Sequence, residues 1–291
     1  MIEYLIGVDG GGSGTRVRLA RADGSELAAG HGGPSGLAHG IDPAWHAVEH
    51  AIEHAFYAAA LAKPARAAMA IGLGLAGVHN KQWAASFIGS QPGYAAVALE
   101  SDAFTTLLGA HRGQPGAIVA IGTGSVGEVL DRAGGRREVG GWGFPSGDEA
   151  GGAWIGLRAL GHIQQVQDGR AAANPFADAV IAACGGTRDA IQVWLAGANQ
   201  TAYAQLARLV LEHGPGNPVA HAILTEAGSQ VGLIAHALDP AAELPLALCG
   251  GLAEPLRAYL PEALLGRLVT PHGDSAAGAL GLIARHVRER A

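Results

Sequence analysis

Lysine is almost absent from this chain of 291 residues, which contains only Lys63 and Lys81. Neither lysine follows a glycine-rich loop. A P-loop ends in Gly-Lys-Ser/Thr, and a protein kinase needs a lysine on its third strand. The sequence therefore excludes both classes, and a bound phosphate must be held by backbone N–H groups, hydroxyls and a metal ion.

Cysteines and long apolar runs are also scarce. The two cysteines, Cys184 and Cys249, argue against a disulfide framework and favour a reducing compartment. No apolar run approaches the length of a membrane span, and the first residues do not resemble a signal peptide. A net charge of −6 gives no general attraction to nucleic acid or anionic membranes. We therefore expect a cytoplasmic protein that binds neither nucleic acid nor a membrane.

Glycine, in contrast, is abundant, and many of the 46 glycines gather in two similar turns. The first turn is at Asp9–Thr15 and the second at Gly122–Ser125, each between two strand-like runs. Glycines let backbone N–H groups close on an anion, and Ser and Thr hydroxyls add donors. The pattern predicts two phosphate-binding turns, one in each half of the chain, as in a nucleotide-dependent phosphotransferase.

Both turns have simpler interpretations. The first could be a plain hairpin turn, but four glycines in five positions exceed what such a turn needs. Asp9, at the strand end, is placed to hold a hydrated Mg²⁺. The second turn begins a G-x-G-x-x-G pattern, which binds dinucleotides only when it opens a helix. Because Glu128–Leu130 indicates a strand, we favour a phosphate turn.

Periodicity and turn signals predict an α/β protein with two domains and a cleft between them. The boundary is placed at Pro115, after which the pattern of strand, glycine turn and strand begins again. Helices dominate residues 152–237. The remaining expected elements are strands at 4–9, 15–20, 26–28, 67–74, 95–99 and 244–248 and helices at 43–62, 102–111 and 275–290.

Carboxylates at element ends are further candidates. Asp102 stands where a strand ends and a helix begins, so it either caps the helix, a role that Ser101 could share, or accepts a proton during phosphoryl transfer. The spacing leaves both possibilities open. Gly140–Glu149 combines aromatic rings, glycines and carboxylates, which suits a sugar, although Asp148 and Glu149 could serve only as charges at a helix N-terminus.

Two more segments deserve a functional and a structural interpretation. The double glycine within Leu246–Ala253 would admit a purine ring, or it simply connects a strand to a helix. His46–His54 matches the H-x-x-E-H pattern of some zinc proteases twice. No distant third ligand stands out, so we expect a solvated helix face there.

In this order, the motifs resemble those of the BadF/BadG/BcrA/BcrD ATPase family, within the actin-like sugar kinase superfamily, and most of all its N-acetylglucosamine and glucosamine kinases. The resemblance covers essentially the whole length and is sharpest at Asp9–Thr15, Ala120–Ser125 and Gly140–Trp154. It implies two ribonuclease-H-like domains that close over ATP and a sugar. The first would comprise residues 1–114 and a C-terminal helix at about 275–291, and the second residues 115–274.

The resemblance also implies roles for individual residues, with ATP and Mg²⁺ as cofactors. Asp9 would organise the Mg²⁺, and Asp102 would take the proton from the sugar 6-hydroxyl. The residues implied to contact ATP are Gly11, Gly12, Ser13, Gly14, Thr15, Gly122, Thr123, Gly124, Ser125, Gly250 and Gly251. The residues implied to contact the sugar are Thr123, Trp142, Asp148 and Gly36. Gly36 stands where the family usually has an asparagine, which leaves the identity of the amino sugar open.

The same family contains activator ATPases that hold an iron–sulfur cluster and need cysteine ligands. Cys184 and Cys249 do not resemble a ligand set, so this activator or regulatory ATPase is the alternative to a kinase. An actin-like structural ATPase would need insertions for which the chain is too short. Kinases of this kind are often homodimers, and a homodimer is possible here.

Overall fold

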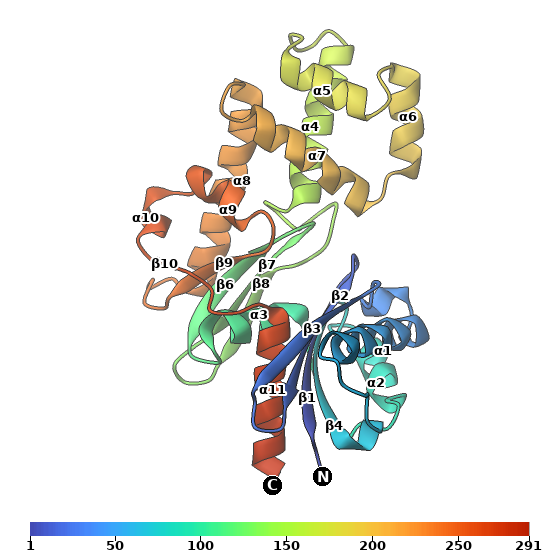
Figure 1. The fold of residues 1–291 in the computed structure, drawn as a ribbon. Helices are drawn as coiled ribbons and strands as arrows, with labels where there is room; N and C mark the ends of the chain where they lie inside the picture. Colours follow the sequence, from blue (N-terminus) through green and yellow to red (C-terminus); the bar gives the residue numbers. More distant parts are fainter. Residues whose placement is uncertain (291) are drawn as a thin grey trace. The chain divides into compact units, whose positions relative to one another are not determined.

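The computed structural model describes residues 1–290, which divide into two compact units. The first unit consists of Met1–Gly116 and the chain from Thr270 onward, and the second of Ala117–Val269. Each unit contains a five-stranded sheet. Helices pack around the sheet in both units (Figure 1). This confirms the predicted α/β fold class.

The sheet of the first unit has the strand order β3-β2-β1-β4-β5. β2 is antiparallel to its neighbours β1 and β3, whereas β1, β4 and β5 run parallel. Asp9, Gly74 and Glu100 therefore form a row across the carboxyl ends of the three parallel strands. The strands are β1 (Tyr4–Gly10), β2 (Thr15–Arg21), β3 (Glu26–Gly32), β4 (Met69–Leu75) and β5 (Ala96–Glu100).

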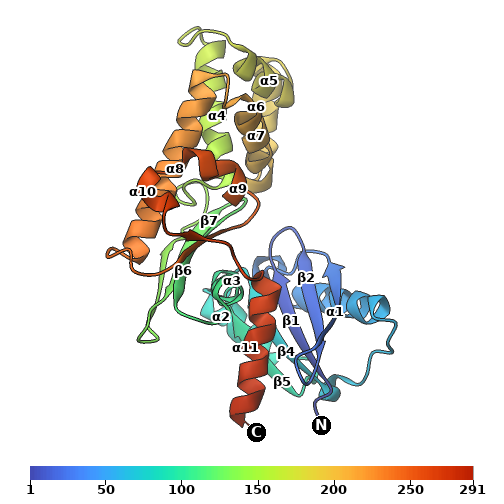
Figure 2. The same cartoon turned by 60° about the vertical axis from the view of Figure 1, so that its left-hand side comes forward.

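Helices cover both faces of this sheet because side chains alternate between the faces of a strand. Ile6 and Val8 pack toward α1, and Leu5 packs toward α11. A Cβ on Gly7 would lie 2.2 Å from the carbonyl oxygen of Ala276, so this glycine lets α11 lie directly on β1 (Figure 1 and Figure 2). The helices are α1 (Ile41–Ala58), α2 (Lys81–Gly89), α3 (Asp102–His111) and α11 (Ser275–Arg290), with short 3₁₀ turns at Leu37–His39 and Arg66–Ala68.

The second unit repeats the arrangement of the first sheet. Its strand order is β10-β9-β6-β7-β8, so β6 to β10 take the places of β1 to β5. The second glycine turn joins β6 and β7, just as the first joins β1 and β2. The strands are β6 (Gly116–Ile121), β7 (Ser125–Leu130), β8 (Arg136–Gly140), β9 (Leu246–Cys249) and β10 (Leu268–Val269).

Five long helices of the second unit share one apolar core with its sheet, in which Trp154, Phe176 and Val231 are buried. Two of them begin at an Asn-Pro pair, where the side chain of Asn174 or Asn217 accepts hydrogen bonds from the first turn. The helices are α4 (Gly152–Gln167), α5 (Pro175–Ala183), α6 (Arg188–Gly197), α7 (Gln200–His213) and α8 (Pro218–Leu238), followed by the short α9 (Ala253–Leu256), a 3₁₀ turn at Arg257–Tyr259 and α10 (Glu262–Leu265).

The expected elements are present, with some differences in extent. The third strand continues to Gly32 instead of ending near residue 28, and α1 ends at Ala58 instead of residue 62. The helix α2 was not expected. None of the helices in residues 1–290 is long and apolar enough to cross a membrane.

Candidate active site

The first glycine turn leaves three consecutive backbone amides unpaired. Gly11 N–H donates to Gly14 O at 3.1 Å and closes the turn, while the Gly11 carbonyl accepts from Ser35 and Gly36 N–H at 3.2 and 3.0 Å. Within the described part of the chain, the N–H groups of Gly12–Gly14 have no acceptor. Successive unpaired amides form a concavity that attracts anions, so this turn can bind a phosphate group.

The two hydroxyls of this turn are used differently. Thr15 is buried, and its Oγ1 lies 2.6 Å from both Gly33 O and Ser35 Oγ, so it ties the following loop to the hairpin. Ser13 is exposed, and among residues 1–290 its hydroxyl has no partner. Gly36 lies against the turn, because a Cβ on it would be 3.4 Å from the carbonyl carbon of Gly11. Only Ser13 therefore offers a free hydroxyl to a ligand here.

The second turn closes in a similar way but is fixed by a helix. Gly122 N–H donates to Gly124 O at 2.8 Å, and the carbonyls of Gly122 and Thr123 accept from the first two residues of α4 at 2.8 and 2.9 Å. The N–H groups of Thr123 and Gly124 have no acceptor anywhere in the described chain. Ser125 Oγ donates to Glu149 O, whereas the exposed Thr123 keeps its hydroxyl free. This turn, too, can receive a phosphate.

The side chain of Asp148 packs against the second turn and is held by two hydrogen bonds. Its Oδ1 accepts from Gly143 N–H at 3.0 Å, and its Oδ2 accepts from Gln200 Nε2 at 2.9 Å. A Cβ on Gly124 would lie 2.1 Å from Asp148 Oδ2, so the carboxylate packs directly on the turn. Burial raises the pKa of Asp148, although both hydrogen bonds oppose the shift. Because each oxygen already has a protein partner, the contact of Asp148 with a sugar hydroxyl stays a prediction.

Of two further side chains in this part of the second unit, the sequence predicted one as a sugar contact and did not predict the other. Trp142 was expected at the sugar, and its side chain is 86% exposed, so an aromatic face is available to a ligand. Gln200 was not expected, since it follows Asp148 by 52 residues. The one local signal is Asn199, whose side chain caps α7 and so fixes Gln200 at the first position of that helix.

In the first unit, α3 brings a second carboxylate near Asp9. Ser101 caps this helix, since its Oγ accepts from Phe104 N–H at 3.1 Å, which leaves Asp102 available for other roles. A Cβ on Gly74 would lie 1.8 Å from Thr105 Oγ1, so the bare backbone at Gly74 lets α3 lie on β4. Burial raises the pKa of Asp102, and the carboxylate of Asp9 raises it further. A carboxylate with a raised pKa is a stronger base, as proton abstraction from a hydroxyl requires.

Asp9 also has a positive neighbour, Arg16, which faces it across the β1–β2 pair. Arg16 Nε and Nη2 lie 2.9 and 2.6 Å from Asp9 Oδ2. Mg²⁺ is usually bound by one or two carboxylates together with substrate phosphates. The carboxylate of Asp9 beside an anion-binding turn fits this chemistry. The described side chains include no cluster of three or more His, Cys, Asp or Glu that could hold a metal alone.

The double glycine after β9 serves two purposes. Gly250 has a φ of +89°, and a Cβ on it would lie 2.4 Å from Ile121 O, so this position is needed for the tight connection from strand to helix. Leu252 N–H donates to the same Ile121 oxygen at 3.0 Å. Gly251 is exposed, like Gly250, but has open space at its Cβ position. Gly251 therefore does not owe its place to close packing, and its backbone is accessible to a ligand.

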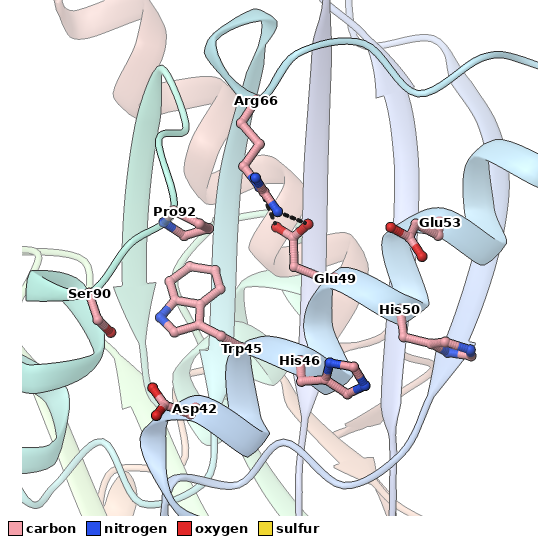
Figure 3. Close-up of a pocket in the computed structure, with 9 residues that line it drawn as sticks. All are labelled: Asp42, Trp45, His46, Glu49, His50, Glu53, Arg66, Ser90 and Pro92. Carbon is pink, nitrogen blue, oxygen red and sulfur yellow. Dashed lines mark hydrogen bonds and ion pairs between the residues drawn. The ribbon is translucent and has the colours of Figure 1, made fainter.

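The histidine-rich face of α1 lines a groove of about 440 Å³. Figure 3 shows the Glu49 carboxylate facing Arg66 and not the imidazoles of His46 and His50. Burial favours a higher pKa for Glu49, but hydrogen bonds from Arg66 and Tyr94 lower it. Lys63 Nζ lies 3.3 Å from Glu49 Oε2. Glu49 is half-buried, so the expectation of a wholly solvated face is wrong at this position. Its carboxylate is engaged by these partners, which argues against a zinc-protease site.

Residues 6–282 match the sequence profile of the BadF/BadG/BcrA/BcrD ATPase family. The chain belongs to this family. Glucosamine kinase GspK of Vibrio cholerae serotype O1 is 30% identical over 280 residues, which are 96% of this chain and 95% of that protein. N-acetylmuramic acid/N-acetylglucosamine kinase of Clostridium acetobutylicum is 29% identical over 162 residues, 55% of this chain and 53% of that protein.

A solved structure is more similar still. The crystal structure of a candidate N-acetylglucosamine kinase from Chromobacterium violaceum superposes with a TM-score of 0.95 and 52% sequence identity, over 97% of this chain and 99% of that chain. The similarity extends through both units. The predicted membership of the BadF/BadG/BcrA/BcrD ATPase family and the predicted two-domain fold are confirmed.

The cysteines of this BadF/BadG/BcrA/BcrD ATPase are poor candidates for an iron–sulfur cluster. Burial raises the pKa of the Cys249 thiol to about 12 and also raises that of Cys184. Cluster ligands are thiolates, and this burial disfavours the thiolate form of both cysteines. Cys184 directly follows α5 and Cys249 ends β9, so the two also belong to separate elements.

Proposed function

We propose that this protein is an ATP-dependent kinase that phosphorylates an amino sugar, glucosamine or N-acetylglucosamine, at the 6-hydroxyl. The observation that carries the proposal is a pair of glycine turns with unpaired amides, one of which lies in the same unit as a carboxylate of raised pKa. The coarser conclusion, a sugar kinase, is confirmed by the full-length relatives. The family name, an ATPase family, supports ATP as the phosphoryl donor.

In this proposal the first unit carries the chemistry. Asp102 accepts the proton of the attacking sugar hydroxyl, and its raised pKa suits it to that task. The amides of Gly12–Gly14 and the free hydroxyl of Ser13 bind phosphate oxygens. Asp9 holds Mg²⁺, which when bound neutralises charge on the transferring phosphoryl group. Catalysis in phosphoryl transfer comes mainly from such positioning and charge neutralisation.

The second unit binds and orients the ligands. Thr123 and Gly124 contribute amides to the phosphates, and Thr123 adds its hydroxyl. Gly251 gives the adenosine access to the backbone, while Gly250 shapes the connection that presents it. Trp142 offers its exposed ring to the apolar face of the sugar, and Asp148 accepts from a ring hydroxyl with a lone pair that Gly143 and Gln200 leave free.

Gly36 bears on which sugar is used. It is a backbone donor to Gly11 in the wall of the first turn, and it carries no polar side chain for a sugar hydroxyl. A sugar contact at this position is therefore limited to the backbone. We accordingly propose the amino sugars as a class, with the N-acetyl group as the feature to be tested.

The test is turnover of Mg²⁺-ATP with glucosamine, N-acetylglucosamine, N-acetylmannosamine, glucose and no sugar, with ³¹P–¹H NMR of the product to locate the phosphate. We expect strong stimulation by one of the first two sugars and a phosphate coupled to the C6 protons. A phosphate on another carbon would overturn the 6-hydroxyl assignment alone. Slow ATP hydrolysis that no sugar stimulates would instead favour an activator or regulatory ATPase.

A further inference from the structure

Arg16 is the one cation that the structure places directly on the carboxylate proposed to bind metal, as far as the described residues show. It is the second residue of β2 and pairs with Asp9 in the hairpin whose turn carries the free amides. Both Arg16 Nε and Arg16 Nη2 donate to the same oxygen, Asp9 Oδ2. The side chain of Asp9 is 13% exposed and that of Arg16 is 61% exposed, so the guanidinium covers the carboxylate from the solvent side.

A second carboxylate lies near this pair. Asp9 raises the pKa of Asp102, so the two carboxylates repel each other, and His79 acts in the opposite direction on Asp102. Arg16 supplies positive charge on Asp9 itself. A divalent cation on Asp9 would supply positive charge in the same place and would compete with the guanidinium for the same carboxylate.

We propose that Arg16 couples metal binding to nucleotide binding: it holds Asp9 in the metal-free protein, Mg²⁺ displaces it, and the nucleotide phosphates receive the displaced guanidinium. The inference rests on the proposed function, because it assumes that Asp9 and the adjacent turn bind a metal–nucleotide complex. It adds Arg16 to the proposed site, as a residue that determines the order in which metal and nucleotide bind and how strongly the two binding steps are coupled.

The charged groups around Arg16 explain why a guanidinium displaced by metal needs the nucleotide phosphates as a new partner. Asp274 is near enough for Arg16 to lower its pKa, but Asp274 already accepts hydrogen bonds of 2.9 and 3.1 Å from Arg18. A guanidinium displaced by metal alone therefore exchanges Asp9 for a carboxylate that is already engaged. Phosphates on the Gly12–Gly14 amides would lie two to four residues from Arg16 along the chain, and guanidinium groups bind phosphate strongly.

The experiment is a titration with Mn²⁺, followed by electron paramagnetic resonance, with and without ADP. It compares the wild-type protein with Arg16→Ala. An exposed or partly exposed ion pair shifts an equilibrium by up to about fivefold. Without ADP, Arg16→Ala should therefore bind Mn²⁺ about three- to fivefold more tightly than wild type. The factor by which ADP tightens Mn²⁺ binding should shrink in the same variant, as the linkage between two sites requires.

Three further proteins complete the design. Arg21→Ala removes an exposed charge from the other end of β2 and should match wild type. Arg16→Lys keeps the charge without the fork of donors and should fall between wild type and Arg16→Ala. Asp9→Asn should lose Mn²⁺ binding with and without ADP. Thermal melting of each variant establishes that it is folded.

The outcomes separate the two levels of the proposal. If wild type binds Mn²⁺ with ADP, but Arg16→Ala binds Mn²⁺ alone no more tightly than wild type, the coupling role of Arg16 is overturned and the proposed function stands. If wild type fails to bind Mn²⁺ even with ADP, the proposed function fails and the role of Arg16 fails with it. Tighter binding in Arg16→Ala but equally in Arg21→Ala would show a general charge effect and would also overturn the inference.

Discussion

The turn at Gly11–Gly14 and the turn at Gly122–Gly124 are each closed by one backbone hydrogen bond, yet their surroundings differ in chemistry. Near the first turn, the carboxylate of Asp9 contributes to the raised pKa of Asp102, whose Oδ1 accepts from one backbone N–H, that of Ala103. At the second turn, both oxygens of Asp148 accept hydrogen bonds from the protein, and these oppose the rise in pKa caused by burial and by Glu149.

The difference shows how two similar glycine turns can serve different tasks, one in the reaction and the other in ligand binding. A carboxylate that is buried with few donors and has a like-charged neighbour is costly to ionise, which makes it reactive toward a proton. A carboxylate with a donor on each oxygen is held in one orientation and shapes the backbone around it. Under the proposed function, we therefore expect the first turn to belong to the reacting half of the protein and the second to the half that holds the ligands.

The largest expected effect is that of Asp102→Asn, which tests whether the first unit contains the base. The amide keeps the shape of the side chain but cannot take a proton, so kcat should fall about 10²–10⁴-fold while the KM for ATP changes little. Steady-state kinetics with the preferred sugar measures both constants. Near-normal turnover would show that the first unit does not contain the base.

A second prediction contrasts two glycines of the second turn. Gly124→Ala places a Cβ 2.1 Å from Asp148 Oδ2, and overpacking of this kind should cost about 1–3 kcal/mol in the free energy of unfolding. Gly122→Ala has open space at its Cβ, so stability should stay within about 0.5 kcal/mol of wild type. Urea denaturation measures both values.

Gly122→Ala also tests the binding role of the turn. The added methyl group stands beside amides that would receive phosphate, so the KM for ATP should rise about tenfold, or roughly 1.4 kcal/mol. A variant with normal stability and normal KM would contradict the assignment of this turn to the nucleotide.

A third prediction uses the two threonines, which occupy different environments. Thr15→Ala removes a buried hydroxyl that lies 2.6 Å from two oxygens, and unfolding should become easier by about 1–2 kcal/mol. Thr123→Ala removes an exposed hydroxyl with no partner in the described chain, so it should leave the melting temperature unchanged. Its effect should be a several-fold rise in the KM for ATP, from the loss of about 1 kcal/mol.

Reversal of this pattern, with Thr15→Ala affecting only nucleotide binding, would mean that the loop at Gly33–Gly36 does not depend on the hydroxyl of Thr15. Thr15→Ser supplies the matched control, because it keeps the hydroxyl and should restore most of the stability. Thermal unfolding monitored by circular dichroism is sufficient for all three proteins.

The smallest expected effect is a pH dependence of stability at Asp102. Its pKa is higher in the folded than in the unfolded chain, so the folded state binds more protons between the two values. The ionised group therefore opposes folding at neutral pH, and this penalty disappears as the pH falls below the unfolded value. Asp102→Asn should melt slightly higher than wild type at pH 7, and the difference should vanish in acid. A lower melting temperature for the variant at pH 7 would contradict a net cost of burying the Asp102 charge, which accepts one hydrogen bond, from Ala103 N–H.

Elements with a strong local signal were predictable from sequence. The helix at 102–111 was predicted at its observed bounds, because Asp102 and Ser101 both offer a cap where the preceding strand ends. The helix at 275–290 was expected for similar reasons. The strand at 268–269 was not, because two residues show no periodicity. The helix α2 was missed, although Asn80 caps it, because its turns follow a stretch without a sustained apolar pattern.

For the candidate site, local sequence identified the two turns but not their partners. The capping role of Ser101 was one of two possibilities until the geometry of α3 decided between them. Gln200 could not be expected, because its contact with Asp148 arises from the placement of α7 against the second turn. The pairing of Arg16 with Asp9 needs the hairpin register, which a glycine-rich sequence specifies weakly.

The packing of α11 on β1 has a consequence for biosynthesis. Translation completes the whole of Ala117–Val269 before it reaches Ser275. Until then, the nascent first unit lacks α11, the helix that covers Leu5 and Gly7. Domains generally fold as units as they leave the ribosome, in the order in which they are made. Here the order is reversed: the half of the protein that is begun first is completed last, and the second unit can finish folding while the sheet of the first is still exposed on one face.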